Sequence, residues 1–163
     1  MEFALRAARD KAREVFSRHS DRPVLASDTV VELEGHILGK PSSRTEAVEM
    51  LESLSGRRHQ VHTAVAIRTP ESEASLVETA EVAIRPLTAN QIEWYVATGE
   101  PMDKAGAYAV QGCAGLFVEA VTGSPHTVVG LPLHRLEELF AAVGLDLWDL
   151  LNRASVPRLN PRT

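Results

Sequence analysis

Hydrophobic and polar positions change their spacing along the chain, and each change predicts an element. Apolar residues first recur three or four positions apart, which predicts an amphipathic helix that ends near Ser20 and carries Lys11 at the border of its apolar stripe. That stripe consists of Leu5, Ala8, Ala12, Val15 and Phe16. The same spacing over Leu131 to Val143 predicts a second amphipathic helix, whose inward residues are Leu136, Leu139, Phe140 and Val143.

Two shorter helices are indicated by their capping residues. Ser43-x-x-Glu46 is typical of a capping box that opens a helix through Leu54, and Thr88-x-x-Gln91 is typical of another that Gly99 ends. A short helical turn is expected from Asp146 to Asn152.

Alternation of polar and apolar residues predicts the strands. The period of two is regular from His59 to Ile67, and the connection after it is too short for a crossover helix, so Leu76 to Pro86 should pair with it in the antiparallel sense. Shorter strands are expected at Val24 to Ala26, Val30 to Leu33, Ile37 to Leu38 and Leu116 to Val121. The order of elements predicts one α/β domain over residues 1–151, a mixed twisted sheet flanked by helices, with a loose tail over 152–163.

A carboxylate in the middle of an apolar segment is the first candidate for chemistry. Asp28 lies between Val24 and Val31, and a hairpin at Glu34-Gly35 returns Lys40 toward the same neighbourhood. Because burying an unpaired carboxylate is costly, Asp28 is hydrogen-bonded, exposed at a strand bend or retained for function. A phosphate site, in which lysine neutralises charge while the carboxylate holds a metal or accepts a proton, and a structural Asp28–Lys40 ion pair both remain open.

The loop from Asp103 to Gly112 is the second candidate. Its small residues beside Lys104 would let the backbone approach a nucleotide closely, although loop glycines without ligands are common. By contrast, His59 and His62 lie on opposite faces of a predicted strand, and we interpret them as strand residues rather than a metal pair.

Composition and charge narrow the function classes. A chain of 163 residues with 44% hydrophobic and 24% charged residues is typical of one soluble domain, and no apolar run approaches the ~20 residues that span a bilayer. The net charge of −5, without a basic face, argues against a nucleic-acid polymer as ligand. The single cysteine, Cys113, and the lack of a recognisable signal peptide predict a cytoplasmic setting.

Several motifs occur in an order that resembles one known family. They are Ser27-Asp28-Thr29-Val30-Val31, Gly39-Lys40-Pro41, Leu54-Ser55-Gly56 with His59-x-Val61-x-Thr63, Tyr95-Val96 before Glu100-Pro101, Asp103-Lys104-Ala105-Gly106-Ala107-Tyr108 with Gln111-Gly112, and Val128-Val129-Gly130-Leu131-Pro132-Leu133. From Ala4 to about Gly144 the chain resembles the Maf family of nucleoside triphosphate pyrophosphatases. The resemblance implies metal-assisted hydrolysis of a nucleoside triphosphate to the monophosphate and pyrophosphate, on a fold similar to that of the inosine triphosphate pyrophosphatases. The Asp-Thr pair and the Asp-Lys-Ala-Gly loop with its glutamine resemble the dTTP and UTP branch rather than the 7-methyl-GTP branch.

The resemblance also implies roles for individual residues. Asp28 matches the catalytic carboxylate, which accepts a proton or binds the metal. The expected metal is a divalent cation such as Mg or Mn. Thr29 and Gln111 match positions associated with base selection. The lysines that match phosphate-binding positions are Lys11, Lys40 and Lys104. Two structural alternatives stay open: Gln111 as a partner of loop backbone, and Lys11 as a solvated residue at the helix edge.

The chain departs from the family pattern at its amino end. Family members begin with a strand and a loop reading roughly Ser-x-Ser-Pro-Arg-Arg, so we expect an amino-terminally truncated fold that lacks some phosphate ligands. A start placed too late, a truncated gene and a short paralogue without catalysis are the competing explanations. The alternative function is therefore a catalytically impaired nucleotide-binding or cell-division regulatory protein. Expected partners are a nucleoside triphosphate and, in a homodimer, a second copy of the chain, with no membrane or nucleic-acid polymer.

Overall fold

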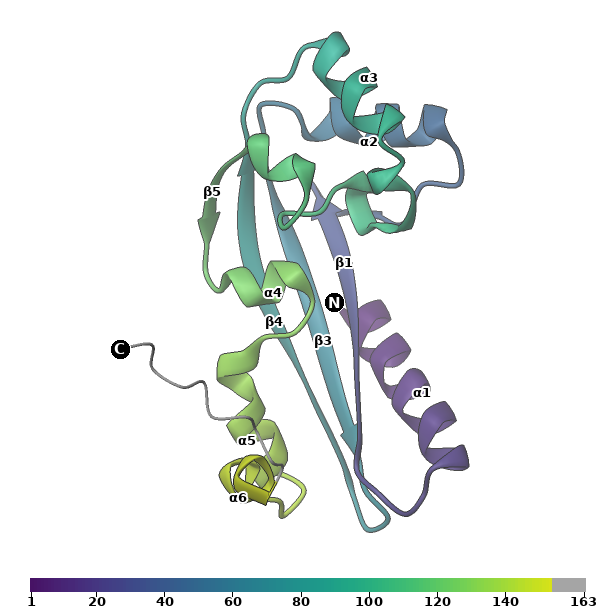
Figure 1. Ribbon diagram of the computed structural model, residues 1–163, viewed down its shortest axis with the longest axis vertical. Helices are drawn as coiled ribbons and strands as arrows, with labels where there is room; N and C mark the ends of the chain where they lie inside the picture. The colour runs from purple at the N-terminus through teal and green to yellow at the C-terminus, as the bar shows by residue number, and fades with distance from the viewer. Residues whose placement is uncertain (154–163) are drawn as a thin grey trace, which may run out of the picture.

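The computed structural model describes residues 1–153, and a twisted five-stranded sheet forms its centre (Figure 1). The strand order is β2-β1-β3-β4-β5, and all four pairings are antiparallel. The strands are β1 (Val24–Leu33), β2 (His36–Leu38), β3 (Arg58–Arg68), β4 (Glu73–Ile84) and β5 (Val118–Thr122). A sheet flanked by helices is confirmed, while the described strands include no parallel pair of the kind that a mixed sheet contains.

Strand β1 is continuous, where the sequence predicts two separate strands. Nine of its residues, from Val24 to Glu32, pair with β3, and this long ladder keeps Asp28 inside the strand instead of at a bend. The hairpin at Glu34-Gly35 is confirmed, because both residues adopt positive φ angles of 51° and 83°. Only Val31 to Leu33 pair with β2, so the outer edge of β1 before Val31 has no partner among the described strands.

The long β3–β4 hairpin has helices on both faces. On one face, Ala64 and Ala66 pack against α1 (Glu2–Arg18), which lies along the strands in Figure 1. The helix residues in this contact are the fully buried Ala4, Ala8 and Ala12, and such small side chains let the helix approach the sheet closely. On the other face, Val65 and Ile67 pack against Leu139 of α5 (Leu136–Ala141).

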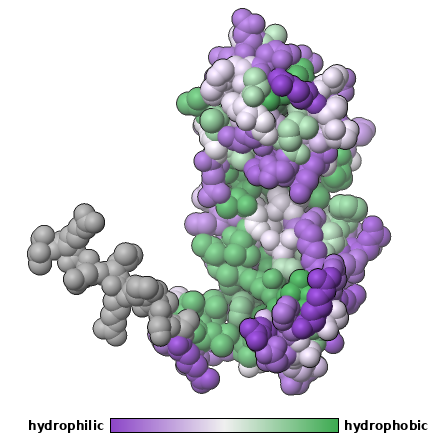
Figure 2. All heavy atoms as spheres, turned by 45° about the vertical axis from the view of Figure 1, so that its right-hand side comes forward, coloured by the Kyte–Doolittle hydropathy of each residue, from purple (hydrophilic) through white to green (hydrophobic). Residues whose placement is uncertain are grey.

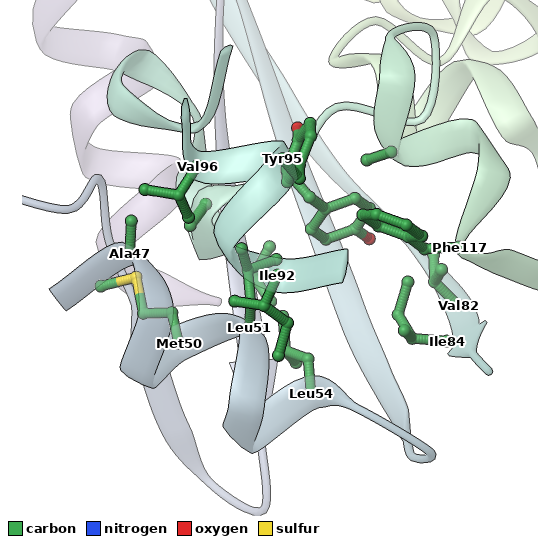
Figure 3. Packing of buried hydrophobic residues seen from close by; sticks show 14 of the residues in the cluster. Ala47, Met50, Leu51, Leu54, Val82, Ile84, Ile92, Tyr95, Val96 and Phe117 are labelled. Carbon is green, nitrogen blue, oxygen red and sulfur yellow. The ribbon is translucent and has the colours of Figure 1, made fainter. Parts of the chain in front are cut away.

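A second hydrophobic cluster lies at the end of the sheet where α2 (Arg44–Leu54) and α3 (Ala89–Ala97) pack together (Figure 3). Tyr95 is fully buried and meets Phe117 edge to face, with ring centroids 5.4 Å apart. The other labelled residues are Ala47, Met50, Leu51 and Leu54 of α2, Ile92 and Val96 of α3, and Val82 and Ile84 of β4. This cluster anchors the loop that follows α3.

The predicted helix caps are mostly confirmed. Thr88 and Gln91 form the complete capping box at α3. At α2, Ser43 accepts from the Glu46 backbone N–H as expected, but the Glu46 carboxylate accepts from the backbone and hydroxyl of Ser42 instead of from Ser43. Only half of that predicted capping box is therefore present.

The predicted helix from Leu131 to Val143 is shorter than expected. Pro132 lacks an N–H and restricts the residue before it, so the segment begins with the 3-10 turn η4 (Leu133–Arg135) and continues as α5. The remaining helices are α4 (Pro125–Val129) and α6 (Leu147–Arg153), and the 3-10 turns η1 (Glu100–Asp103), η2 (Ala105–Ala107) and η3 (Cys113–Leu116) precede β5.

Two further expectations concern the chain as a whole. The helical turn expected from Asp146 to Asn152 is present as α6, which extends through Arg153, and the rest of the predicted loose tail lies outside the described residues. Among the described helices, none combines the length and apolar character needed to cross a membrane.

Candidate active site

A cavity of about 430 Å³ lies where β1 meets α1, α4 and the loops after β2 and η1. Figure 2 shows one face of the molecule, on which apolar side chains gather below a mainly polar upper lobe. The charged residues that line the cavity are Lys11, Asp28, Lys40, Asp103 and Lys104, and its uncharged polar residues include Ser27, Thr29 and Gln111. Every site residue that the sequence predicts therefore lines one cavity. The apolar lining includes Val31, Val61, Val128 and Tyr108.

Asp28 is paired with Lys11 rather than with Lys40. The Lys11 Nζ lies 2.6 Å from Asp28 Oδ1 and also donates to the Ser27 backbone oxygen at 3.2 Å. The Asp28 side chain is only 18% exposed, while that of Lys11 is 54% exposed. The alternative of an Asp28–Lys40 ion pair is thus wrong, and so is the alternative of a Lys11 that contacts only solvent. Packing of α1 on β1 brings these two residues together.

Lys40 and Lys104 are brought to the cavity by two loops that contact each other. The Gly106 N–H donates to the Gly39 backbone oxygen at 3.0 Å. Gly106 has a φ of +66°, and a Cβ there would approach Val31 Cγ2 to 3.0 Å, so this close contact requires glycine. Lys40 forms no ion pair with any residue in the 1–153 range. Its ammonium group is free to meet a phosphate.

The cavity contains a second carboxylate, Asp103, which the sequence did not indicate as a site residue. Both of its oxygens accept from Lys104 Nζ at 2.8 Å. That hydrogen bond, together with the charges of Lys104 and Lys40, holds the pKa of the Asp103 carboxyl below its usual value despite some desolvation. The loop therefore presents an anion held between two cations.

Thr29 and Gln111 differ in how firmly they are held. The Thr29 Oγ1 lies 2.8 Å from Thr63 Oγ1 of the neighbouring strand. The side chain of Gln111 makes no hydrogen bond to any other described residue. The structural alternative in which Gln111 satisfies loop backbone is therefore wrong for the described part of the chain. Its amide remains available to a ligand.

A partly exposed hydrogen-bond network positions the loop that carries Gln111. The Glu100 carboxylate accepts from Tyr95 Oη at 2.8 Å and from the Cys113 backbone N–H at 2.9 Å. Desolvation acts to raise the pKa of Glu100, but the hydrogen bonds from Cys113 and Tyr95 outweigh it and hold the pKa below its usual value. A Cβ at Gly112 would overlap this carboxylate, so a larger residue there would displace the Glu100 side chain from these hydrogen bonds. Glu100 and Tyr95 thus fix the backbone on both sides of Gln111.

The two strand histidines are structural, as predicted. His59 is 3% exposed, and its Nε2 lies 2.8 Å from the Tyr108 hydroxyl. Burial lowers the pKa of His59 to about 4, so the ring is neutral. His62 lies on the opposite face of β3 and pairs with Thr79 and Glu32. Through Tyr108, His59 supports the cavity wall.

Comparison with known proteins places the chain in a family. The sequence model described as "Maf-like protein" matches residues 1–143. The chain belongs to the Maf family. Three relatives, each named "dTTP/UTP pyrophosphatase", come from Pectobacterium atrosepticum (49% identical, 85% of this chain and 71% of the relative), Symbiobacterium thermophilum (46%, 90% and 76%) and Moorella thermoacetica (51%, 85% and 72%). The predicted resemblance is confirmed.

The carboxylates of this Maf-family chain suit a metal that the substrate helps to hold. Among residues 1–153, no group of three His, Cys, Asp or Glu side chains could hold a metal ion. Mg²⁺, however, often binds through one or two carboxylates together with substrate phosphates and water. Asp28 Oδ1 is taken by Lys11, and no described residue donates to Oδ2. The donor set therefore fits a divalent cation bound by Asp28 and a phosphate, with Asp103 in the same cavity.

Sequence reasoning missed several residues on which the site depends. Tyr108, Glu100 and Thr63 all belong to motifs that carried the family resemblance, but no role was assigned to them. Nothing local in the sequence indicated that Glu100 holds this loop. The glycine at position 112, where a Cβ would overlap the Glu100 carboxylate, is the only trace of that contact in this motif. Thr63 gave no signal, because a β-branched residue among valines is typical of a buried strand.

Proposed function

We propose that this Maf-family chain is a nucleoside triphosphate pyrophosphatase that hydrolyses dTTP and UTP. The observation that carries the proposal is one cavity with two carboxylates, three lysines, an apolar wall and the uncharged hydrogen-bonding side chains of Ser27, Thr29 and Gln111. Lysines suit phosphate oxygens, and the apolar wall with neutral polar groups suits a nucleobase. The names of the curated relatives support the same substrates.

The proposed reaction breaks the bond between the α-phosphorus and the oxygen that leads to the β-phosphorus. Water attacks the α-phosphorus, its proton passes to Asp28 Oδ2, and pyrophosphate leaves as the nucleoside monophosphate forms. Lys40 and Lys104 neutralise the charge that develops on the phosphate oxygens. Lys11 holds Asp28 Oδ1, so the other oxygen stays directed at the water.

Asp28 Oδ2 has two lone pairs, so one would hold a divalent cation, Mg²⁺ or Mn²⁺, together with the substrate phosphates, while the other faces the water. The cation would supply positive charge to the phosphoryl oxygens. The chain itself is acidic, with a net charge of −5, so long-range attraction does not bring the substrate in. The local lysines and the cation must overcome that repulsion. Activity should therefore depend on added metal, and chelation with EDTA should abolish it.

The proposal is tested by incubating the chain with dTTP, UTP, ATP and GTP in Mg²⁺ or Mn²⁺ and measuring pyrophosphate and monophosphate. We expect release from dTTP and UTP, and in ¹⁸O-labelled water the label should enter the monophosphate. Label in pyrophosphate would contradict attack at the α-phosphorus. Binding of dTTP without turnover would favour the alternative, a nucleotide-binding regulatory protein. Equal turnover of all four nucleotides would contradict the pyrimidine preference.

A further inference from the structure

A chain of hydroxyl groups leads from the cavity into the core. Thr29, which lines the cavity, lies 2.8 Å from Thr63 through their Oγ1 atoms. Thr63 is fully buried, and its Oγ1 lies 2.6 Å from the backbone oxygen of Thr127 in α4. The same carbonyl also accepts from the Gly130 N–H at 3.1 Å, at the carboxyl end of α4. Helix α4 lies in front of the sheet in Figure 1.

The directions of these hydrogen bonds are determined by the carbonyl. A carbonyl oxygen only accepts, so Thr63 must donate its single hydroxyl hydrogen to Thr127. Thr63 then has nothing left to donate to Thr29, and the contact between their hydroxyls requires Thr29 to be the donor. The Thr29 hydrogen is consequently directed into the core, and only its oxygen lone pairs remain for the cavity.

The Gln111 side chain, in contrast to that of Thr29, has no fixed hydrogen-bonding direction. No described residue fixes its amide, so rotation about the terminal bond presents either the oxygen or the NH₂ group to a ligand. An amide that can turn over accepts a base with either hydrogen-bonding pattern. Discrimination between such bases must come from a group whose direction is fixed, and within the cavity Thr29 is held in that way.

We propose that Thr63 is a positioning residue that, through Thr29, makes the site select pyrimidines with an N3–H, as in uracil and thymine, over cytosine. This inference rests on the proposed function. In thymine and uracil nucleotides the only ring N–H donor, N3–H, lies between two carbonyl groups. The Thr29 oxygen can accept a hydrogen bond from it. Cytosine presents a lone pair at N3, which meets the lone pairs of Thr29 and leaves both groups unpaired.

The test is Thr63→Val, which keeps the shape of the side chain and removes its hydroxyl. Thr29 then loses its fixed acceptor and can turn its hydrogen toward the ligand. We expect the ratio of kcat/KM for dTTP to that for dCTP to fall about tenfold or more, because one directed hydrogen bond no longer discriminates. Thr63→Ser, which retains the hydroxyl, should restore the wild-type ratio. A purely structural role would lower both rates equally and leave the ratio unchanged.

A matched control is Thr69→Val, because Thr69 is a threonine of 3% exposure whose hydroxyl bonds to Ser72 outside the cavity. Its dTTP to dCTP ratio should equal that of the wild type. An unchanged ratio in Thr63→Val, with dTTP still hydrolysed, overturns the inference and leaves the proposed function intact. If Thr63→Val does not fold, Thr29→Ser and Thr29→Val replace it: the serine should keep the ratio, and a valine that also keeps it overturns the inference.

Failure of the proposed function has a different signature. A wild-type chain that releases no pyrophosphate from dTTP contradicts that function, and the same variants are then compared by calorimetric titration with dTTP and dCTP. We expect the ratio of the two dissociation constants to shift as the kinetic ratio would. Equal affinity of the wild type for dTTP and dCTP overturns the inference, as does binding of neither.

Discussion

Asp28→Asn should separate chemistry from folding, because the substitution keeps the side-chain shape and removes the charge. Loss of a general base typically lowers the rate by ~10² to 10⁴-fold, so kcat for dTTP should fall within that range. Stability should change little. The partner of Asp28, Lys11, is 54% exposed, and an ion pair this accessible contributes at most about 1 kcal/mol, or roughly 2–4 °C in Tm for a domain of this size.

The assay follows pyrophosphate release from dTTP, with a thermal melt of each variant. Glu81→Gln is the matched control, since Glu81 on β4 also pairs with a cation at 2.6 Å, namely Arg58, but does not line the cavity. Its turnover should equal that of the wild type. An Asp28→Asn variant that hydrolyses dTTP at the wild-type rate would refute the assignment of Asp28 as the base.

A second comparison asks whether Asp28 acts only by holding Lys11. If it did, Lys11→Met would lower kcat as much as Asp28→Asn, and the double variant would lose no more than either single one. We expect instead that Lys11→Met raises KM and lowers kcat less. Equal and non-additive losses would show that the ion pair, rather than the carboxylate, matters for turnover.

Three further outcomes are expected from the structure. Gln111→Ala should lower kcat/KM for dTTP and dCTP by similar factors and leave their ratio unchanged, because an amide that bonds either base is lost from the cavity. Gly112→Ala should lower stability by ~1–3 kcal/mol in urea unfolding, since the added methyl displaces the Glu100 carboxylate from its hydrogen bonds with Tyr95 and Cys113. The free energy of unfolding of the wild type should be highest above pH 6.5 and fall by about 3 kcal/mol toward pH 4. In that range the unfolded chain protonates this histidine, whereas buried His59, with its pKa of about 4, stays neutral in the folded chain. His59→Phe should flatten this pH dependence in denaturant titrations.

Local signals in the sequence were sufficient for most elements. The alternation from His59 to Ile67 and the complete capping box at Thr88 depend on residues close in sequence, so pattern alone predicted them. The break expected in β1 at Asp28 was wrong for a tertiary reason. Asp28 keeps its extended conformation because β3 pairs with it at Ala64 and Lys11 neutralises its charge, and neither partner is near it in sequence.

The candidate site shows the same contrast between residues that the local sequence indicates and residues whose role depends on the fold. Chemistry-bearing residues such as Lys40 and Lys104 could be selected from the sequence because their charge is unusual beside glycine and small residues. The residues that hold them in place could not. In the sequence, Glu100 is an ordinary carboxylate after a helix, and its role appears only in the fold, where Tyr95 and the Cys113 backbone donate hydrogen bonds to it. Supporting residues resemble ordinary core or loop residues until the fold brings their partners together.

The two halves of the cavity are held with different rigidity, and this has a consequence for specificity. The lysines of the proposed phosphate side have exposed side chains, which are free to change position. Thr29, on the proposed base side, is fixed through Thr63 to a carbonyl at the end of α4. A phosphate can be held by several arrangements of flexible charges, whereas a hydrogen-bond direction is kept only by a rigid partner. Substitutions around α4 should therefore alter which base is accepted more than whether pyrophosphate is released.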